Sequence, residues 1–450
     1  MAKKKTALFE CQACGFQSSK WMGKCPNCGA WDSFLELNET QKEILRSQNT
    51  SAASSQKAKP ITEIKEEFYE RFSTGDRELD LVLGGGVVPG SLTLIGGSPG
   101  VGKSTLLLKI GGNLAKSGKR VLYVSGEESL GQIKMRANRL EANEENLYLL
   151  SEIDLEKIFS ELNREKFDIL IVDSIQTLYV PRLTAAPGSV SQVREITFEL
   201  MRWGKEGGSA IFIIGHITKE GSIAGPRILE HMVDTVLYFE GDSSREIRML
   251  RGFKNRFGST SEVGIFEMGK RGLVSAADIS QKFFSRSAPQ AGSALTVTME
   301  GSRPIVLEVQ ALVSQSGYPN PKRSATGFEL NRLNMLLALL ERKLDLPLNE
   351  YDVFVNIAGG IKISEPAADL AIIAAIISSF RDRAIGKESV FIGEVSLIGD
   401  IREVVSLDQR LKEAKSQGFT KAIIPQKPLE TPRGIKCFVA DEVSKLIEWM

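Results

Sequence analysis

The sequence has almost no net charge and no long apolar run. Its 57 lysines and arginines are balanced by 56 aspartates and glutamates, which leaves a formal net charge of +1. This balance excludes a generally basic surface, so any contact with nucleic acid must come from local patches. The apolar stretch at residues 370–380 is about half as long as a membrane-spanning helix. No apolar run follows the first lysines, which argues against a signal peptide. We therefore expect a cytoplasmic protein.

Cysteine is also scarce, with five residues in 450. Disulfides are rare in the cytosol, so these cysteines do not predict a disulfide framework. Four of them, Cys11, Cys14, Cys25 and Cys28, form two CxxC pairs separated by ten residues. Two such pairs can place four thiolates around Zn²⁺ and leave no open position for a water, which predicts a structural four-cysteine zinc finger. Reduced cysteines without a metal are the less favoured alternative, and Cys437 is interpreted as a core residue.

Aromatic and basic residues lie among these cysteines. Trp21, Trp31, Lys20 and Lys24 could stack on bases and contact the phosphates of DNA. They could equally pack the small module or bind a protein, and the sequence leaves these alternatives open. A thioredoxin-like redox role is disfavoured, because the first CxxC pair does not open a helix after a strand.

The length of the chain predicts two or three domains. The cysteine module occupies residues 1–37. Residues 38–60 indicate a flexible linker, because they lack a hydrophobic period and are rich in Ser, Gln, Ala and Lys. Residues 61–275 alternate β-rich runs with helical patterns, as a parallel α/β sheet does. A second linker is expected at 276–293, followed by another α/β unit at 294–450.

The expected strands are short apolar runs between helical patterns. In the central domain they cover residues 91–97, 120–126, 167–174, 209–216 and 234–240. In the last domain we expect strands near 295–299, 304–311, 353–357 and 390–396, and helices near 329–343, 366–380 and 407–417.

A glycine-rich loop follows the first of these strands. The run GGSPGVGKST matches the phosphate-loop pattern GxxxxGK[ST], in the strand–loop–helix context that the pattern requires. Backbone N–H groups of such a loop surround phosphates, and the helix N-terminus adds positive potential. The predicted nucleotide-binding residues are Gly97, Ser98, Pro99, Gly100, Val101, Gly102, Lys103, Ser104 and Thr105.

The chemistry of these residues predicts binding of ATP with Mg²⁺. Lys103 is expected to reach the β- and γ-phosphates, and Ser104 to ligate Mg²⁺. Asp173 ends an apolar strand, where a carboxylate can hold the Mg²⁺ shell. Glu127 and Glu128 follow another strand at the same sheet edge, and one of them is predicted to be the base that orients the attacking water. The sequence does not decide which, and an acidic pair favoured by a helix N-terminus is the alternative.

Residues 72–110, FSTGDRELDLVLGGGVVPGSLTLIGGSPGVGKSTLLLKI, resemble the core of RecA-type ATPases. With the cysteine module, the run KNRFG at 254–258 and the last unit, the whole chain resembles the bacterial RadA family, also called Sms. This resemblance implies a RecA-like P-loop ATPase that is stimulated by DNA and forms a ring, typically a hexamer. It also implies helicase activity, binding of single-stranded and branched DNA, and branch migration of recombination intermediates alongside the RecA recombinase in DNA repair.

The resemblance assigns further roles by position. It places a polar γ-phosphate sensor at His216, one of only two histidines, for which capping of the strand end is the alternative. A DNA-binding loop would follow, with Lys219 and Arg227 among its glycines. A second DNA-binding loop would contain Arg182 as its one charge. Flexible loops with few cations suit sequence-independent binding to a phosphate backbone.

The same resemblance concerns Lys254 and Arg256, two positions apart near the end of a strand. In RecA-type rings and filaments, a matching pair of cations reaches the ATP of the neighbouring subunit and stabilises charge during phosphoryl transfer. The favoured hypothesis is that both residues contact the γ-phosphate on the next subunit. The alternatives are a contact with the DNA backbone and a solvated surface pair.

Residues 294–450 resemble the proteolytic domain of Lon proteases, which uses a Ser–Lys dyad. Ala367 stands where the Lon serine would be, and Asp408 stands where the lysine would be. The resemblance therefore implies a proteolytically inactive scaffold that serves in oligomerisation. Lys322, Arg323 and Lys362 could line a DNA path or be ordinary solvated residues.

Two classes of function are compatible with these features. The leading hypothesis is a motor enzyme that couples ATP hydrolysis to movement on DNA. The alternative is an ATP-gated regulatory ring that binds protein partners without moving on DNA. An active ATP-dependent protease is disfavoured by Ala367 and Asp408.

Overall fold

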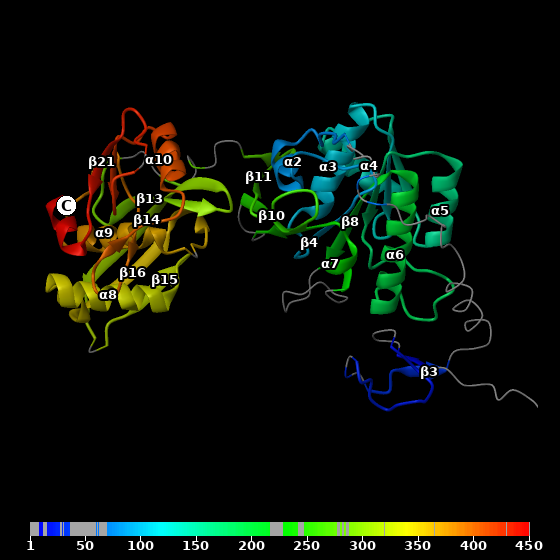
Figure 1. The fold of residues 1–450 in the computed structure, drawn as a ribbon, viewed down its shortest axis with the longest axis horizontal. Helices are drawn as coiled ribbons and strands as arrows, with labels where there is room; N and C mark the ends of the chain where they lie inside the picture. Colours follow the sequence, from blue (N-terminus) through cyan, green and yellow to red (C-terminus); the bar gives the residue numbers. More distant parts are fainter. Residues whose placement is uncertain are drawn as a thin grey trace, which may run out of the picture. The chain divides into compact units, whose positions relative to one another are not determined.

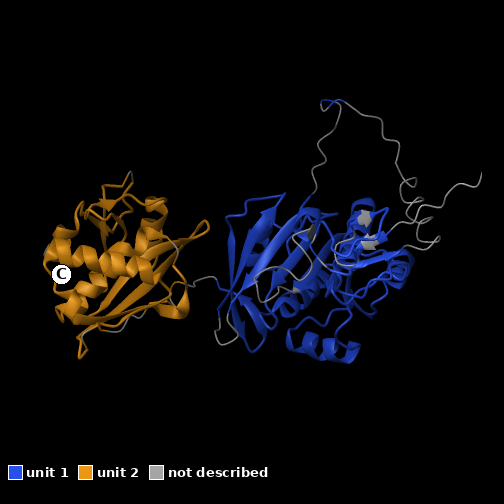
Figure 2. Ribbon diagram, turned by 90° about the horizontal axis from the view of Figure 1, so that it is seen from below, with its two compact units in different colours: residues 1–276 blue, residues 277–450 orange. Residues whose placement is uncertain are grey.

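The chain forms two compact units, residues 1–276 and 277–450 (Figures 1 and 2). The computed structural model describes residues 9–11, 16–27, 29, 31–36, 60, 62, 70–216, 228–241, 247–276, 280, 283–284, 288–318, 320–363, 365–428 and 430–449. Both units combine helices and strands, which confirms the predicted α/β class. No helix within these ranges is long and apolar enough to cross a membrane.

A nine-stranded sheet forms the centre of unit 1, in the order β12-β11-β10-β9-β4-β8-β7-β5-β6. The strands from β9 to β6 in this order run parallel, and β10 to β12 extend the sheet in antiparallel fashion. All five strands expected here are present, with ends shifted by at most two residues. The bounds are β4 (Leu92–Gly97), β5 (Val121–Ser125), β6 (Leu147–Ser151), β7 (Ile169–Asp173), β8 (Ala210–His216), β9 (Thr235–Glu240), β10 (Ile247–Asn255), β11 (Val263–Gly269) and β12 (Gly272–Ser275).

Helices cover both faces of this sheet. Successive residues of a strand point to opposite faces, and apolar residues on each face pack against helices. Ile95 and Tyr123 belong to a core shared with α2, α3 and α4. Leu94 and Val124 belong to a second core shared with α5, α6 and α7. The helices are α2 (Arg77–Leu83), α3 (Lys103–Lys116), α4 (Leu130–Arg139), α5 (Leu155–Arg164), α6 (Val190–Gly207) and α7 (Ile228–Met232).

The carboxyl ends of β4, β5, β7 and β8 meet at one edge of the sheet. The strand register pairs Gly97 with His216, and Ser125 with Asp173. The loops after these strands therefore converge, as they do at the ligand-binding edge of open α/β sheets.

The cysteine module contains a three-stranded antiparallel sheet in the order β2-β1-β3. Its strands are β1 (Phe9–Cys11), β2 (Gln17–Ser18) and β3 (Phe34–Glu36). Cys11, Cys25 and Phe34 form its buried cluster. Phe9 and Met22 are partly buried against this cluster.

Unit 2 contains a four-stranded sheet in the order β13-β14-β16-β15 and a parallel sheet in the order β17-β20-β21. The apolar stretch noted in the sequence forms α9, which is buried along most of its length. The bounds are β13 (Ser293–Glu300), β14 (Arg303–Gln315), β15 (Arg323–Thr326), α8 (Leu330–Leu344), β16 (Tyr351–Ile357), α9 (Asp369–Phe380), β17 (Ser389–Phe391), β18 (Glu394–Val395), β19 (Ile401–Arg402), α10 (Leu407–Ser416), β20 (Lys421–Ile424) and β21 (Lys436–Val439).

The stretch predicted to be a second linker contributes to the core of unit 2. Phe283 and Phe284 are only 0% and 8% exposed. The backbone of Glu308, in β14, donates a hydrogen bond to the carbonyl of Phe283 at 3.0 Å. The side chains of Phe283 and Phe284 therefore attach this part of residues 276–293 to unit 2. The other predicted domain boundaries stay predictions.

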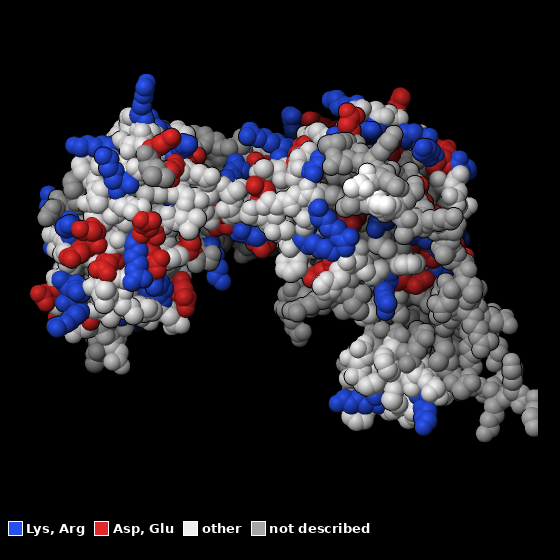
Figure 3. Space-filling model, viewed as in Figure 1, with Lys and Arg blue, Asp and Glu red and all other residues white. Residues whose placement is uncertain are grey.

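Charged side chains are mixed on the face shown in Figure 3. Lysine and arginine alternate there with aspartate and glutamate over both units, and no large field of one sign is visible. This distribution agrees with the net charge of +1.

Candidate active site

The predicted phosphate loop connects β4 to α3. A Cβ atom at Gly97 would lie 2.6 Å from the carbonyl oxygen of Phe239, because β4 is packed between β8 and β9. Gly102 has a φ of +115°, in the region that favours glycine. Glycine at these two positions lets the backbone turn directly into α3. Ser98, Pro99 and Gly100 are exposed at the tip of the loop.

Lys103 lies in the first turn of α3 and is only 4% exposed. Its Nζ donates to the carbonyl oxygens of Gly97 at 2.7 Å and Ser98 at 3.0 Å. Burial lowers the pKa of Lys103, while the charges of Asp173 and Glu127 oppose this shift. The ammonium group is thus held inside the loop, within the field of two carboxylates.

Asp173 ends β7 and is 4% exposed. The hydroxyl of Tyr123, in β5, donates to Asp173 Oδ2 at 2.5 Å. Burial raises the pKa of Tyr123 well above its usual value, and the charge of Asp173 adds to this effect. The phenol therefore stays protonated and fixes one oxygen of the carboxylate.

The two neighbouring glutamates have different partners. Ser174 Oγ donates to Glu127 Oε1 at 2.6 Å. Glu128 instead forms an ion pair with Arg136 of α4, with 2.6 Å between Oε2 and Nη2. The hydroxyl of Ser125 accepts from the backbone N–H groups of both glutamates, at 3.3 and 3.1 Å. The structure thus gives different partners to Glu127 and Glu128, which the sequence could not distinguish.

The structure describes some of the remaining predicted contact residues fully, one through its backbone alone and others not at all. Ser104 and Thr105 are half-buried in the first turn of α3. His216 ends β8 beside Gly97 in the register, and only its backbone is described. Lys219 and Arg227 lie outside the described residues, so their predicted DNA contacts stay predictions.

Lys254 and Arg256 both face residues 230–234 of their own chain. Lys254 Nζ donates to the carbonyls of Glu230, His231 and Val233, at 2.8, 3.1 and 2.7 Å. Burial lowers the pKa of Lys254, the charge of Arg256 adds to this effect, and Asp234 opposes it.

Arg256 is much less constrained than Lys254. Its side chain is 53% exposed, and its Nη1 lies 3.7 Å from Asp234 Oδ1. A half-exposed pair at this distance contributes little to stability. Lys254 therefore caps the end of α7, while the side chain of Arg256 is half-exposed beside Asp234.

Two other residues of the KNRFG run fix its position, and sequence reasoning missed both. Asn255 Nδ2 donates to the carbonyl of Val82 at 3.1 Å. Gly258 packs so closely on Gly84 that a Cβ atom would lie 2.8 Å from the Gly84 Cα. The GGG run at 84–86, after α2 and inside the stretch that resembles RecA-type cores, was the available signal for such a close backbone approach.

Arg182, a predicted DNA contact, is paired with two carboxylates of α6. Its Nη2 lies 2.5 Å from Glu195 Oε1 and 2.8 Å from Glu199 Oε1. Burial disfavours the charge of Arg182, but these hydrogen bonds outweigh burial and raise the pKa of the guanidinium. This placement favours a structural role, and a DNA contact by Arg182 stays a prediction.

Two of the four predicted zinc ligands are described. Cys11 and Cys25 are 0% and 1% exposed, and Cys11 Sγ lies 3.1 Å from Ser33 Oγ. Cys14 and Cys28 lie outside the described residues. Trp21 and Trp31 are 55% and 71% exposed, so neither tryptophan fills the core of this module.

Unit 2 has no serine or lysine at the positions of the Lon dyad. Ala367 is buried, and Asp408 lies half-buried in the first turn of α10. An ion pair joins the two segments instead: Arg410 Nη1 and Nη2 each lie 2.7 Å from an oxygen of Glu365. Lys322 and Lys362 are exposed, and Arg323 lies 3.8 Å from Glu341.

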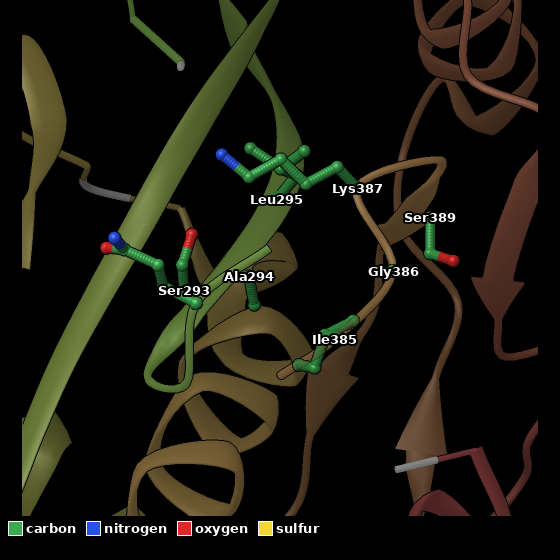
Figure 4. A pocket seen from close by; sticks show the side chains of 8 residues that line it. Ser293, Ala294, Leu295, Ile385, Gly386, Lys387 and Ser389 are labelled. Atoms are coloured by element: carbon green, nitrogen blue, oxygen red, sulfur yellow. The ribbon is translucent and has the colours of Figure 1, made fainter. Parts of the chain in front are cut away.

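A hollow in unit 2 lies between β13 and the segment before β17 (Figure 4). Its volume is about 10 Å³, which is the room of a single water. It is lined by Gln290, Ser293, Ala294, Leu295, Ile385, Gly386, Lys387 and Ser389. This hollow is too small to be a substrate site.

Three family models match the chain. A rubredoxin metal-binding domain matches residues 9–36, which contain all four CxxC cysteines. An AAA domain matches residues 58–222, which contain the phosphate loop, Glu127 and Asp173. Subunit ChlI of Mg-chelatase matches residues 332–428, in the unit that resembles Lon. The chain thus combines a metal-binding ribbon, an ATPase domain and a ChlI-like domain.

Curated relatives match over the full length. DNA repair protein RadA of Campylobacter jejuni is 66% identical over 450 residues, covering 100% of both chains. The proteins of the same name from Helicobacter pylori J99 and Bacillus subtilis are 61% and 50% identical, each covering 99% of this chain and 100% and 99% of theirs. A solved RadB recombinase covers 45% of this chain at 22% identity, with a TM-score of 0.36. The chain belongs to the RadA family of DNA repair proteins.

Proposed function

We propose that this protein is a DNA-stimulated ATPase that moves on single-stranded and branched DNA. The observation that carries this proposal is the convergence of Lys103, Asp173 and Glu127 at one sheet edge. Lys103 would bind the β- and γ-phosphates, since it already lies inside the loop. Glu127 would accept the proton of the attacking water, because its neighbour Glu128 is held by Arg136.

The residues at this edge fit a bound Mg²⁺. Asp173 Oδ2 accepts from Tyr123, so Oδ1 would be the carboxylate oxygen that holds the metal shell, and Ser104, which follows Lys103 in the phosphate loop, would be a ligand. When bound, Mg²⁺ would neutralise charge on the phosphate oxygens. Hydroxyl and carboxylate oxygens are the ligands this ion prefers.

The experiment that tests this proposal is steady-state ATP hydrolysis with and without single-stranded DNA. A several-fold stimulation by DNA that disappears in Lys103→Ala supports a DNA-coupled ATPase. Turnover that is indifferent to DNA would instead favour the ATP-gated regulatory ring. Degradation of casein would revive the protease hypothesis, which the absence of a Ser–Lys pair at Ala367 and Asp408 disfavours.

Arg256 is proposed to act on the ATP of a neighbouring subunit in a hexameric ring. It is the exposed cation of the KNRFG run, whereas Lys254 is bound by three carbonyls of its own chain. Arg256→Ala is therefore expected to lower ATP turnover by about 10³-fold, as loss of an arginine finger does. Its thermal midpoint should stay unchanged, because its pair with Asp234 is weak.

Lys254→Met serves as the contrast to that variant. It removes the donor to three carbonyl oxygens and is expected to destabilise unit 1 by roughly 1–3 kcal/mol. Turnover and thermal unfolding are measured on both variants. Full ATPase activity in Arg256→Ala would contradict the finger role, and an unchanged midpoint in Lys254→Met would contradict the capping role.

Recombinational repair is the proposed setting, with the RecA recombinase as partner. The support is family membership together with the DNA-binding loop predicted to contain Lys219 and Arg227. Unit 2 would serve as an oligomerisation scaffold without peptidase activity. Ala367 and Asp408, at the Lon-dyad positions, offer neither a serine nucleophile nor a lysine base, and the segments around them are joined by the Arg410–Glu365 ion pair.

Zn²⁺ is proposed to hold the cysteine module together. The two described cysteines belong to one buried cluster with Phe34, and cysteine thiolates are ligands that Zn²⁺ prefers. Purified protein should contain about one zinc per chain, and Cys25→Ala should lose it, because three thiolates bind the metal far more weakly than four. Elemental analysis measures the content, and Cys437→Ala is the matched control. Equal zinc in both variants would contradict a site built on the CxxC pairs.

A further inference from the structure

A polar cluster lies behind the metal-side carboxylate and was not anticipated from the sequence. Tyr123, Glu128 and Arg136, here called the support cluster, come from β5, the loop after it and α4. Arg136 Nη2 lies 2.6 Å from Glu128 Oε2, 3.4 Å from Tyr123 Oη and 3.9 Å from Asp173 Oδ2. One guanidinium group therefore contacts or approaches both carboxylates and the phenol that binds Asp173.

The position of Arg136 is well defined by burial. Its side chain is 15% exposed, and that of Asp173 is 6% exposed. Asp173 and Glu128 would repel each other at this short range without a cation between them. Arg136 supplies that cation: its Nη1 donates a hydrogen bond to Glu128 Oε1 at 3.1 Å, and its Nη2 forms the ion pair with Oε2.

Glu127 lies outside this cluster. It accepts from Ser174 at 2.6 Å, and its charge acts on Lys103 in the phosphate loop. The two adjacent glutamates therefore face different cations, Lys103 for Glu127 and Arg136 for Glu128.

We propose that Arg136 is a positioning residue for the metal site: with Tyr123 it aims Asp173 at Mg²⁺, and it holds Glu128 away from the attacking water. This inference rests on the proposed ATPase function. It adds a supporting layer to that site, in which Glu128 balances Arg136 and takes no part in proton transfer. Partners of metal-binding groups commonly change metal affinity when they are replaced.

The test measures how Mg²⁺ strengthens binding of a fluorescent ATP analogue to the full-length protein. In Arg136→Met, the Mg²⁺ concentration at half-maximal effect is expected to rise roughly tenfold. Tyr123→Phe should show a smaller rise in the same direction, and binding without Mg²⁺ should persist in both. Arg139→Met, an exposed arginine on the same helix, is the matched control and should match the wild type.

A second substitution separates positioning from general damage to the fold. Glu128→Gln in the Arg136→Met background removes the unpaired carboxylate and should return the Mg²⁺ midpoint to within about threefold of the wild type. A midpoint in Arg136→Met equal to that in Arg139→Met overturns the proposal, as does a double variant no better than Arg136→Met. If the wild type binds the analogue with Mg²⁺ but hydrolyses no ATP, the proposed ATPase function is refuted. The binding test of Arg136 would still be valid in that case.

Discussion

Replacing Glu127 with glutamine is expected to lower ATP turnover by about 10²–10⁴-fold, which is the usual contribution of a positioned general base. Glutamine keeps the shape of the side chain but cannot take up the proton. Binding of ATP should persist, because Lys103 keeps its place in the loop through the carbonyls of Gly97 and Ser98. Steady-state kinetics should therefore show a fall in kcat with little change in KM.

Glu128→Gln is the matched control for that variant. It is expected to lower turnover by less than about tenfold, since Glu128 is paired with Arg136 and takes no proton in the proposed reaction. The reverse ranking, with Glu128→Gln the more damaging change, would assign the base to Glu128 and contradict the account given for Glu127.

Replacing Arg410 with methionine is expected to destabilise unit 2 by about 3 kcal/mol, as breaking a buried ion pair does. The Arg410 side chain is 1% exposed, and Glu365 accepts from both of its terminal nitrogens. The guanidinium also donates to the carbonyls of Val297 and Val405, at 2.7 and 2.9 Å. The substitution thus leaves a carboxylate without its cation and removes two further hydrogen bonds.

Calorimetry of the full-length protein measures this effect, because bound nucleotide shifts only the transition of unit 1. A loss of 3 kcal/mol corresponds to roughly 6–12 °C for a unit of this size. Lys412→Met, an exposed position on α10, should leave the midpoint unchanged. Glu365→Met combined with Arg410→Met should recover part of the loss. If Arg410→Met unfolds at the same temperature as Lys412→Met, the ion pair does not hold these segments together.

The sequence predicted those parts of the fold whose signals are local. Five strands of the nine-stranded central sheet were expected as runs of apolar residues, and each of these five lies within two residues of its expected ends. The phosphate loop was identifiable because its glycines and Lys103 lie within one short stretch, residues 97–103. Asp173 was identifiable because it ends a buried strand.

The parts that could not be predicted depend on contacts between distant residues. The sequence showed Arg182 as the one charged residue of its loop, but in the structure it forms ion pairs with Glu195 and Glu199 on α6. Lys254 was expected to act together with Arg256 on a phosphate, but in the structure it caps α7. The position of α7 relative to β10 depends on the order of strands in the sheet. Arg136 carried no motif at all, because its importance comes from packing against β5 and β7.

The most direct test of the motor hypothesis is the movement of a labelled branched DNA by purified wild-type protein and by Glu127→Gln, each with ATP and Mg²⁺. The account predicts that both proteins bind the junction and that only the wild type displaces it. Displacement by Glu127→Gln, or a wild type that hydrolyses ATP in the presence of DNA and leaves the junction in place, would contradict it.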